Sequence, residues 1–240
     1  MTGAGAGLGR EIALAYAKAG ARVAICDVND EAGNETLRLL EGTGVECLYR
    51  HCDVTRAEDH QAFVAAVVER FEKLDIACNN AGVGAPPAGI AEYDPELWRR
   101  IIDVNLSGVF YGMRAQIGMM LPRSTGAIVN ISSIMGEVAY PGSPAYTAAK
   151  HGVIGLTKSA AIDYGAKGIR VNAVLPGVIA TAMTICTLTQ DQRNMFEESH
   201  PIGRMAKPHE VSALVLWLST DAASFCSGGS YPVDGGYLAR

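Results

Sequence analysis

The stretch TGAGAGLGREIALAYAKAGARVAICD, residues 2–27, decides the fold expected for this chain. A glycine-rich loop, Thr2–Gly9, opens a helix-forming segment, and an apolar strand follows it and ends at Asp27. Glycines let a backbone turn tightly and approach a pyrophosphate, whose charge then lies against the free N–H groups of a helix N-terminus. The acid after the next strand is placed to bind a ribose. The stretch therefore predicts a dinucleotide-binding unit.

Asp27 also bears on the choice of dinucleotide. A carboxylate accepts hydrogen bonds from ribose hydroxyls and repels a 2′-phosphate, and no arginine follows directly at Val28. These features favour NAD over NADP, with Arg10 as the one cation that argues the other way. The alternative is that Asp27 is only a turn residue at a strand end.

A second informative stretch is ISSIMGEVAYPGSPAYTAAK, residues 131–150, which contains Ser133, Tyr146 and Lys150. On a helix, residues at i and i+4 share a face, so Lys150 can lie beside the group that Tyr146 contacts. A nearby cation favours the phenolate and is expected to lower the pKa of Tyr146. The spacing indicates a proton-transfer site. The alternative is a packed tyrosine and a solvated lysine.

Together these motifs resemble the short-chain dehydrogenase/reductase family over essentially the whole chain. The T-G-x-x-x-G-x-G loop falls on Thr2, Gly3, Gly7 and Gly9, the adenine-side acid on Asp53, and the N-N-A-G strand end on Asn79–Gly82. Asn105, Ser133, Tyr146 and Lys150 fill the family's catalytic tetrad, and residues 176–181 match its segment over the nicotinamide. The resemblance implies cofactor contacts at Gly3, Gly7, Leu8, Gly9, Asp27, Asp53, Val54, Asn80, Ala81, Gly82, Tyr146, Lys150, Pro176, Ile179 and Thr181.

The implied reaction is hydride transfer between NAD(H) and a secondary alcohol or ketone. Tyr146 is expected to act as general acid or base and Ser133 to hold the substrate oxygen, while Ser132 points the other way. Lys150 would bind the nicotinamide ribose, and Asn105 would hold a water that links the lysine to solvent. Two alternatives are an NADPH-dependent 3-oxoacyl or other carbonyl reductase, and a dinucleotide-binding protein without catalysis.

The resemblance also implies the architecture, a single doubly wound α/β Rossmann domain over residues 1–240 with a parallel sheet and helices on both faces. Short apolar runs that alternate with helix-length patterns agree with it. Strands are expected at 22–26, 46–51, 75–78, 127–131, 170–174 and 230–232. We expect the helix over 95–121 to break locally at Asn105, because asparagine is a poor helix former. Residues 181–206 are expected to form a helical lid.

One feature departs from the family, because its first hydrophobic strand is absent here and Met1 directly precedes Thr2. That strand is normally central, so its loss predicts unpaired backbone groups and a gap in the core. We expect either a polypeptide that begins roughly ten residues earlier or a shortened form of low stability.

Composition limits the partners. The net charge of −5 and pI near 5.5 argue against a nucleic-acid or membrane surface, and the absence of a signal peptide or apolar span favours the cytoplasm. The family resemblance implies a homotetramer. Neither the cysteines nor the histidines show metal-binding spacing, so we expect free thiols, inert histidines and no metal. These residues are Cys26, Cys47, Cys52, Cys78, Cys186 and Cys226, with His51, His60, His151, His200 and His209.

Residues expected along the substrate pocket are mostly apolar. Such a lining favours an apolar or cyclic secondary alcohol, and the family resemblance leans toward secondary-alcohol and cyclic-diol dehydrogenases. The alternative is that these residues only pack the lid. They are Val83, Gly84, Met135, Val138, Tyr140, Met183, Met195 and Phe196.

Overall fold

The computed structural model describes residues 1–187 and 189–240, without the side chains of 182, 183 and 187. Every predicted strand is confirmed to within two residues at each end. The strands are β1 (Val23–Asp27), β2 (Cys47–His51), β3 (Ile76–Asn79), β4 (Gly126–Ile131), β5 (Ile169–Pro176) and β6 (Ser230–Val233). The α-helices are α1 (Gly7–Lys18), α2 (Asp30–Glu41), α3 (Ala57–Phe71), α4 (Pro95–Ile102), α5 (Gly108–Met120), α6 (Pro144–Tyr164), α7 (Ala182–Thr187), α8 (Gln190–Glu198) and α9 (Pro208–Ser219).

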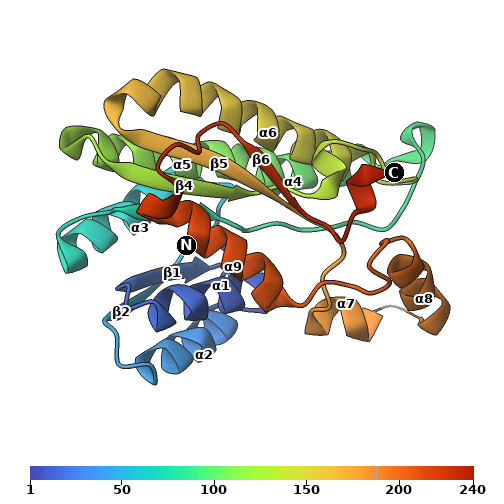
Figure 1. Ribbon diagram of the computed structural model, residues 1–240, viewed down its shortest axis with the longest axis horizontal. Helices are drawn as coiled ribbons and strands as arrows, with labels where there is room; N and C mark the ends of the chain where they lie inside the picture. Colours follow the sequence, from blue (N-terminus) through green and yellow to red (C-terminus); the bar gives the residue numbers. More distant parts are fainter. Residues whose placement is uncertain (188) are drawn as a thin grey trace.

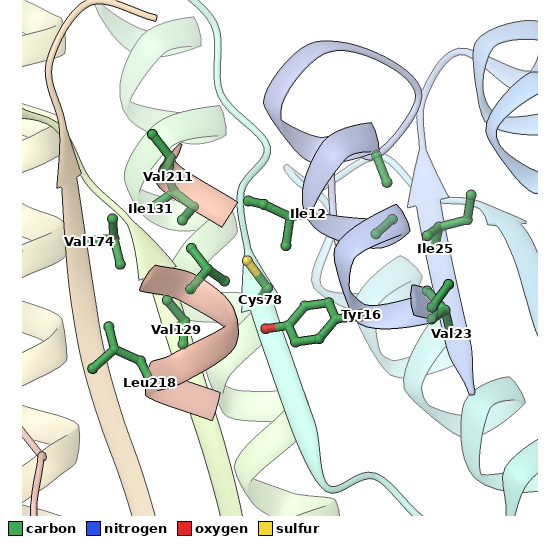
Figure 2. Packing of buried hydrophobic residues seen from close by; sticks show 14 of the residues in the cluster. Ile12, Tyr16, Val23, Ile25, Cys78, Val129, Ile131, Val174, Val211 and Leu218 are labelled. Atoms are coloured by element: carbon green, nitrogen blue, oxygen red, sulfur yellow. The ribbon is translucent and has the colours of Figure 1, made fainter. Parts of the chain in front are cut away.

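Parallel strands with helices on both faces make up the architecture, as expected (Figure 1). Helices α1 and α9 pack together on one face, and α5 and α6 cover the other. Ile12 and Tyr16 of α1 lie among side chains from β1, β3 and α9 (Figure 2). The Tyr16 hydroxyl is 2.7 Å from Ser219 Oγ. This packing joins the parts of the sheet through the helices.

The sheet itself is divided into two parts. Strands β1 and β2 pair with each other, and β3, β4, β5 and β6 form a separate four-stranded sheet. Between them lies the segment Met1–Ala4: Thr2 forms an isolated parallel bridge with Cys26 and donates its N–H to Cys78 O at 3.2 Å. The N-terminus is accordingly drawn between the two sheets in Figure 1. The rest of the gap is a groove of about 300 Å³ lined by residues such as Val23, Phe71 and Ile76.

The expected break near Asn105 is present. Residues Asp103–Ser107 form a π-helical turn between α4 and α5, and Asn105 is fully buried there. Its side chain bonds the backbone of Val83 in both directions: Oδ1 accepts from the N–H and Nδ2 donates to the carbonyl, each at 2.8 Å. A π turn re-aims one residue in an otherwise regular helix, so this turn points the amide at the neighbouring loop.

Helices α7 and α8 form the predicted lid, which stands at one end of the sheet beside the C-terminus (Figure 1). Thr189 and Gln192 make a capping box that starts α8. At the base of the lid Ile179 forms a parallel bridge with Ala206, so both ends of the lid segment leave the body side by side. Within the described residues no helix is long and apolar enough to cross a membrane.

Candidate active site

The catalytic candidates meet at one cavity of about 330 Å³. Ser133 follows the end of β4, and Tyr146 and Lys150 lie one turn apart near the start of α6. All three line the cavity, together with Pro176 at the end of β5 and Ile179 in the segment that follows. The parallel sheet explains the meeting, since the carboxyl ends of neighbouring strands lie at the same edge.

Lys150 is buried and does not point to solvent. Its Nζ donates to the carbonyl of Ile131 at 2.8 Å and lies 5.4 Å from the centroid of the Tyr146 ring. Burial lowers the pKa of Lys150 to about 8. The ammonium is therefore held at the cavity wall, and the alternative of a solvated lysine is wrong.

The pKa of Tyr146 moves in the direction opposite to our expectation. Burial raises it, and the hydrogen bond with Ser133 opposes that shift. The prediction that the Lys150 charge lowers this pKa fails in this structure because Nζ bonds the Ile131 carbonyl instead of the phenol. The phenol is consequently kept protonated, the form in which it can donate to an oxygen in the cavity.

The side chains of the two adjacent serines have different hydrogen-bond partners, as expected. Ser133 Oγ accepts from the N–H of Met135 at 3.2 Å and contacts the Tyr146 phenol. Ser132 Oγ donates to the Lys150 carbonyl at 2.9 Å and so braces the backbone of α6. Of the two, Ser133 is thus the one hydrogen-bonded to the phenol, and its hydroxyl can bond a second oxygen there.

Asn105 lies behind the cavity wall and is not among its lining residues. A Cβ added at Gly82 would lie 3.3 Å from Asn105 Oδ1 and 3.8 Å from Lys150 Nζ, so the amide and the ammonium converge on this glycine. By bonding both the N–H and the carbonyl of Val83, Asn105 fixes the position of this residue in the cavity wall.

A second cavity, of about 670 Å³, holds the predicted nucleotide residues. It shares Leu8, Asn80, Gly82 and Val83 with the catalytic cavity, so the two form one continuous cleft. Every cofactor contact expected from the sequence lines one of the two. Those in the second cavity are Gly3, Gly7, Leu8, Gly9, Asp27, Asp53, Val54, Asn80, Ala81, Gly82 and Thr181.

The glycine loop fits a pyrophosphate. Helix α1 begins at Gly7 without a side-chain cap and without an acidic residue in its first turn, so its first N–H groups remain available to an anion. Gly3 and Gly7 have φ of 63° and 54°, a backbone region that favours glycine. A Cβ on Gly9 would come within 2.0 Å of Gly3 O, so only glycine permits this approach of helix and loop.

Asp27 is fixed by backbone donors. Its Oδ2 accepts from the Gly5 N–H at 2.8 Å and its Oδ1 from the Asn29 N–H at 3.0 Å. At the adenine end, Asp53 Oδ1 accepts from the N–H and hydroxyl of Thr55. Both carboxylates are oriented and retain lone pairs for a ligand.

Arg10, the cation that favoured NADP in the sequence, is bonded to other groups of the chain. Its Nη2 donates to Gly5 O at 2.6 Å and to Glu35 Oε2 at 2.7 Å, and its Nε donates to Thr36 Oγ1 at 2.9 Å. The charge is thus paired with a carboxylate of α2. No motif in the sequence signalled this pairing.

The expected substrate-pocket residues divide into two groups. Val83 and Gly84 line the catalytic cavity, whereas Tyr140 lines a neighbouring cavity of about 810 Å³ beside α4 and α6. Tyr140 contacts the lid, with its ring centroid 6.2 Å from that of Phe196 and its hydroxyl 3.9 Å from Met195 Sδ. Met135 and Val138 line none of these cavities, and the side chain of Met183 lies outside the described residues.

The expectation of free thiols is confirmed, since all six cysteines are free. In the described part of the chain no group of three or more histidine, cysteine or carboxylate residues could hold a metal ion. His200 nevertheless is not inert: it is buried and bonds both α8 and the segment after β5. Its place just after the lid helix, in the turn HPIGR, was the only signal for this in the sequence.

Comparisons with known proteins agree with this geometry. A family model described as enoyl-(acyl carrier protein) reductase matches residues 3–238. 2,5-Dichloro-2,5-cyclohexadiene-1,4-diol dehydrogenase of Sphingobium indicum is 40% identical over 100% of this chain and 96% of its own length. The chain belongs to the short-chain dehydrogenase/reductase family. Cyclohexanol dehydrogenase of an Acinetobacter species is also 40% identical, over 100% of this chain and 94% of the relative.

Among solved structures, a variant of actinorhodin polyketide ketoreductase with NADPH superposes with a TM-score of 0.94 at 37% identity. The match covers 100% of this chain and 96% of that one. The fold and the secondary-alcohol and cyclic-diol relatives expected from the sequence are therefore confirmed.

Proposed function

We propose that this chain is an NAD-dependent dehydrogenase of apolar, cyclic secondary alcohols. The observation that carries the proposal is the single cleft that runs from Asp27 and Asp53, past the start of α1, to Ser133, Tyr146 and Lys150. A bound nicotinamide coenzyme would supply the hydride chemistry, and the chain would supply binding, orientation and proton transfer.

The preference for NAD rests on two features of charge. Asp27 presents a carboxylate, held by Gly5 and Asn29, where a 2′-phosphate would meet repulsion. Arg10, the nearby cation, is already bonded to Glu35, Thr36 and the Gly5 carbonyl. Recruiting it to a phosphate would break an existing ion pair.

Proton transfer would use the protonated phenol. Tyr146 would donate to the substrate oxygen in ketone reduction and accept from it in alcohol oxidation. Ser133 would bond the same oxygen, since its hydroxyl both donates and accepts. Lys150, with a pKa of about 8, would be largely cationic at neutral pH and would bind the nicotinamide ribose. Asn105 would keep Val83 in place in the cavity wall. It would also bind a water that connects Lys150 to solvent.

The proposed class of substrate, apolar cyclic secondary alcohols, is supported by the residues that line the cavities and by the names of similar proteins. Val83 and Gly84 add uncharged surface to the catalytic cavity beside Lys150. Tyr140 forms an aromatic contact with Phe196 and a thioether contact with Met195 at the lid. Relatives named for cyclohexanol and a cyclohexadiene diol are 40% identical to this chain. An alicyclic ring suits such a lining better than a charged substrate.

A direct test measures oxidation of cyclohexanol and of cyclohexane-1,2-diol as formation of NADH from NAD and of NADPH from NADP, with the two coenzymes at equal concentrations. We expect activity with NAD and at least about tenfold less with NADP, since each 1.4 kcal/mol of repulsion is tenfold in affinity. Reduction of a 3-oxoacyl thioester with NADPH, without activity on cyclohexanol, would support the carbonyl-reductase alternative. Coenzyme binding without turnover of any alcohol or ketone would support the non-catalytic one.

Assembly and compartment belong to the proposal as well. Large apolar side chains are exposed on α4 and α5 (Trp98 and Phe110) and on α9 and the turn after it (Trp217 and Phe225). Two such surfaces could each bind another copy of the chain and so build a homotetramer. Size-exclusion chromatography with light scattering tests this assembly. Six free cysteines are in keeping with a reducing compartment such as the cytoplasm.

A further inference from the structure

His200 is a buried side chain that the chemistry described above does not use. Only 2% of it is exposed, and it follows the lid helix α8 in the turn Ser199–Arg204. Its ring lies against Tyr237, with centroids 5.4 Å apart. A buried imidazole has two polar atoms that must find partners, so its contacts show what it holds.

The partners fix the protonation of the ring. Nδ1 lies 2.6 Å from the carbonyl oxygen of Phe196, which can only accept, so Nδ1 carries the proton. Nε2 lies 3.2 Å from the backbone nitrogen of Val178, whose N–H can only donate, so Nε2 is bare. The imidazole is neutral and joins two segments, the lid helix at Phe196 and the strand extension at Val178.

One segment lines the cleft, and the other contacts a residue of the neighbouring cavity. Gly177 and Ile179, on either side of Val178, line the catalytic cavity, and Phe196 contacts Tyr140 through its ring. A Cβ at Gly177 would lie 2.6 Å from His200 Nε2, so the glycine makes room for the imidazole. Backbone bonds also hold the extension, from the Gly177 N–H to Val233 O and from the Ala206 N–H to Val178 O.

We infer that His200 is a positioning residue that locks the segment 176–181 to the lid and so shapes the nicotinamide end of the cleft. The identity of the ligand in this inference rests on the proposed function. The connection that His200 makes between Val178 and Phe196 rests on the structure alone. The bond to Val178 should affect the shape of the cleft more than the bond to Phe196 does, because Val178 lies between two residues of the cavity wall. The Phe196 carbonyl, by contrast, has a second donor in Ser199 Oγ at 2.7 Å.

Two isosteric variants separate the two bonds. The amide of glutamine reaches about as far from the backbone as Nε2 of histidine, so His200→Gln can still accept the bond from the Val178 N–H. The amide of asparagine reaches only as far as Nδ1, so His200→Asn can donate to the Phe196 carbonyl but cannot accept from Val178. We expect His200→Asn to raise the dissociation constant of NADH about tenfold, and His200→Gln to stay within about threefold of wild type. The turnover number at saturating NAD should fall less than the affinity, because Tyr146, Ser133 and Lys150 are unchanged.

The measurements are NADH fluorescence titration, KM and kcat, and hydrogen exchange at the Val178 amide without coenzyme. Exchange should be faster in His200→Asn than in wild type and His200→Gln. The exposed His209, changed to asparagine and glutamine, is the control and should alter none of these values.

Equal effects of the two variants on NADH affinity, or unchanged exchange at Val178, would overturn the inference. Failure of both variants to fold would also overturn it, since His200 would then serve stability alone. Wild-type protein that binds no NADH would refute the proposed function, while the exchange comparison would still decide whether His200 holds Val178.

Discussion

Filling the groove between β1 and β3 should stabilise the protein. Counting back from the bridge between Thr2 and Cys26, residues placed ahead of Met1 would continue a parallel strand opposite Ala24, Val23 and Arg22. Helices cover both faces of the groove, which is lined by apolar side chains including Tyr16, Phe63 and Phe71 from α1 and α3, so all inserted residues should be apolar. The perturbation is an extension of four alternating valine and isoleucine residues behind a short polar lead.

The magnitude follows from burial and ordering. Each buried aliphatic side chain contributes about 1.5–3 kcal/mol, and each ordered residue costs about 1–2 kcal/mol of backbone entropy. About three new strand hydrogen bonds add roughly 1 kcal/mol each. The extension also removes the buried ammonium of Met1, which donates to Ala24 O at 2.8 Å and whose pKa burial lowers. The net gain is about 6 kcal/mol, or a rise in Tm of about 12–24 °C for a chain of this size.

The assay is thermal unfolding followed by circular dichroism, with a serine and glycine extension of equal length as the control. The control should leave Tm within about 2 °C of the original chain, since it fills little of the groove. Equal Tm values for the apolar and polar extensions would refute the reasoning, because the groove would then not accept a strand.

Three further predictions concern the cleft. Tyr146→Phe should lower kcat by about 10²–10⁴-fold with an unchanged melting curve, because only the proton-transfer group is lost; retained turnover would contradict the assignment. Asp27→Ala should raise the ratio of kcat/KM for NADP over NAD about tenfold in steady-state assays, and an unchanged ratio would contradict the ribose contact. Because the folded pKa of Lys150, about 8, lies below its ordinary value of 10.5, burial of this charge costs stability in full below pH 8, and the cost is relieved as pH rises from 8 toward 10.5. Urea unfolding at pH 8 and about 9.5 should show a rise of up to about 2 kcal/mol in wild type relative to Lys150→Met; parallel pH dependence in the two proteins would argue against the shifted pKa.

Much of the architecture could be predicted from local sequence. Apolar runs such as residues 127–131 and 170–174 are strand-length and adjoin helical patterns, and side-chain periodicity depends on neighbours in the chain. The break at Asn105 was predictable because asparagine competes with the backbone for hydrogen bonds. Ser133, Tyr146 and Lys150 could be placed at one cavity because strand ends and helix faces follow from the fold class.

Other features depended on contacts between residues far apart in sequence. The direction of the Tyr146 pKa shift depends on how deeply the phenol is buried and on the bond from Lys150 Nζ to the Ile131 carbonyl, neither of which spacing determines. The pairing of Arg10 with Glu35, and of His200 with Val178, required two elements to pack first. Local propensity acts through bonds and near neighbours, whereas burial and side-chain partnership arise only when the folded chain excludes water. The motifs could therefore be found in the sequence, and their protonation, charge pairing and positioning were decided by the tertiary structure.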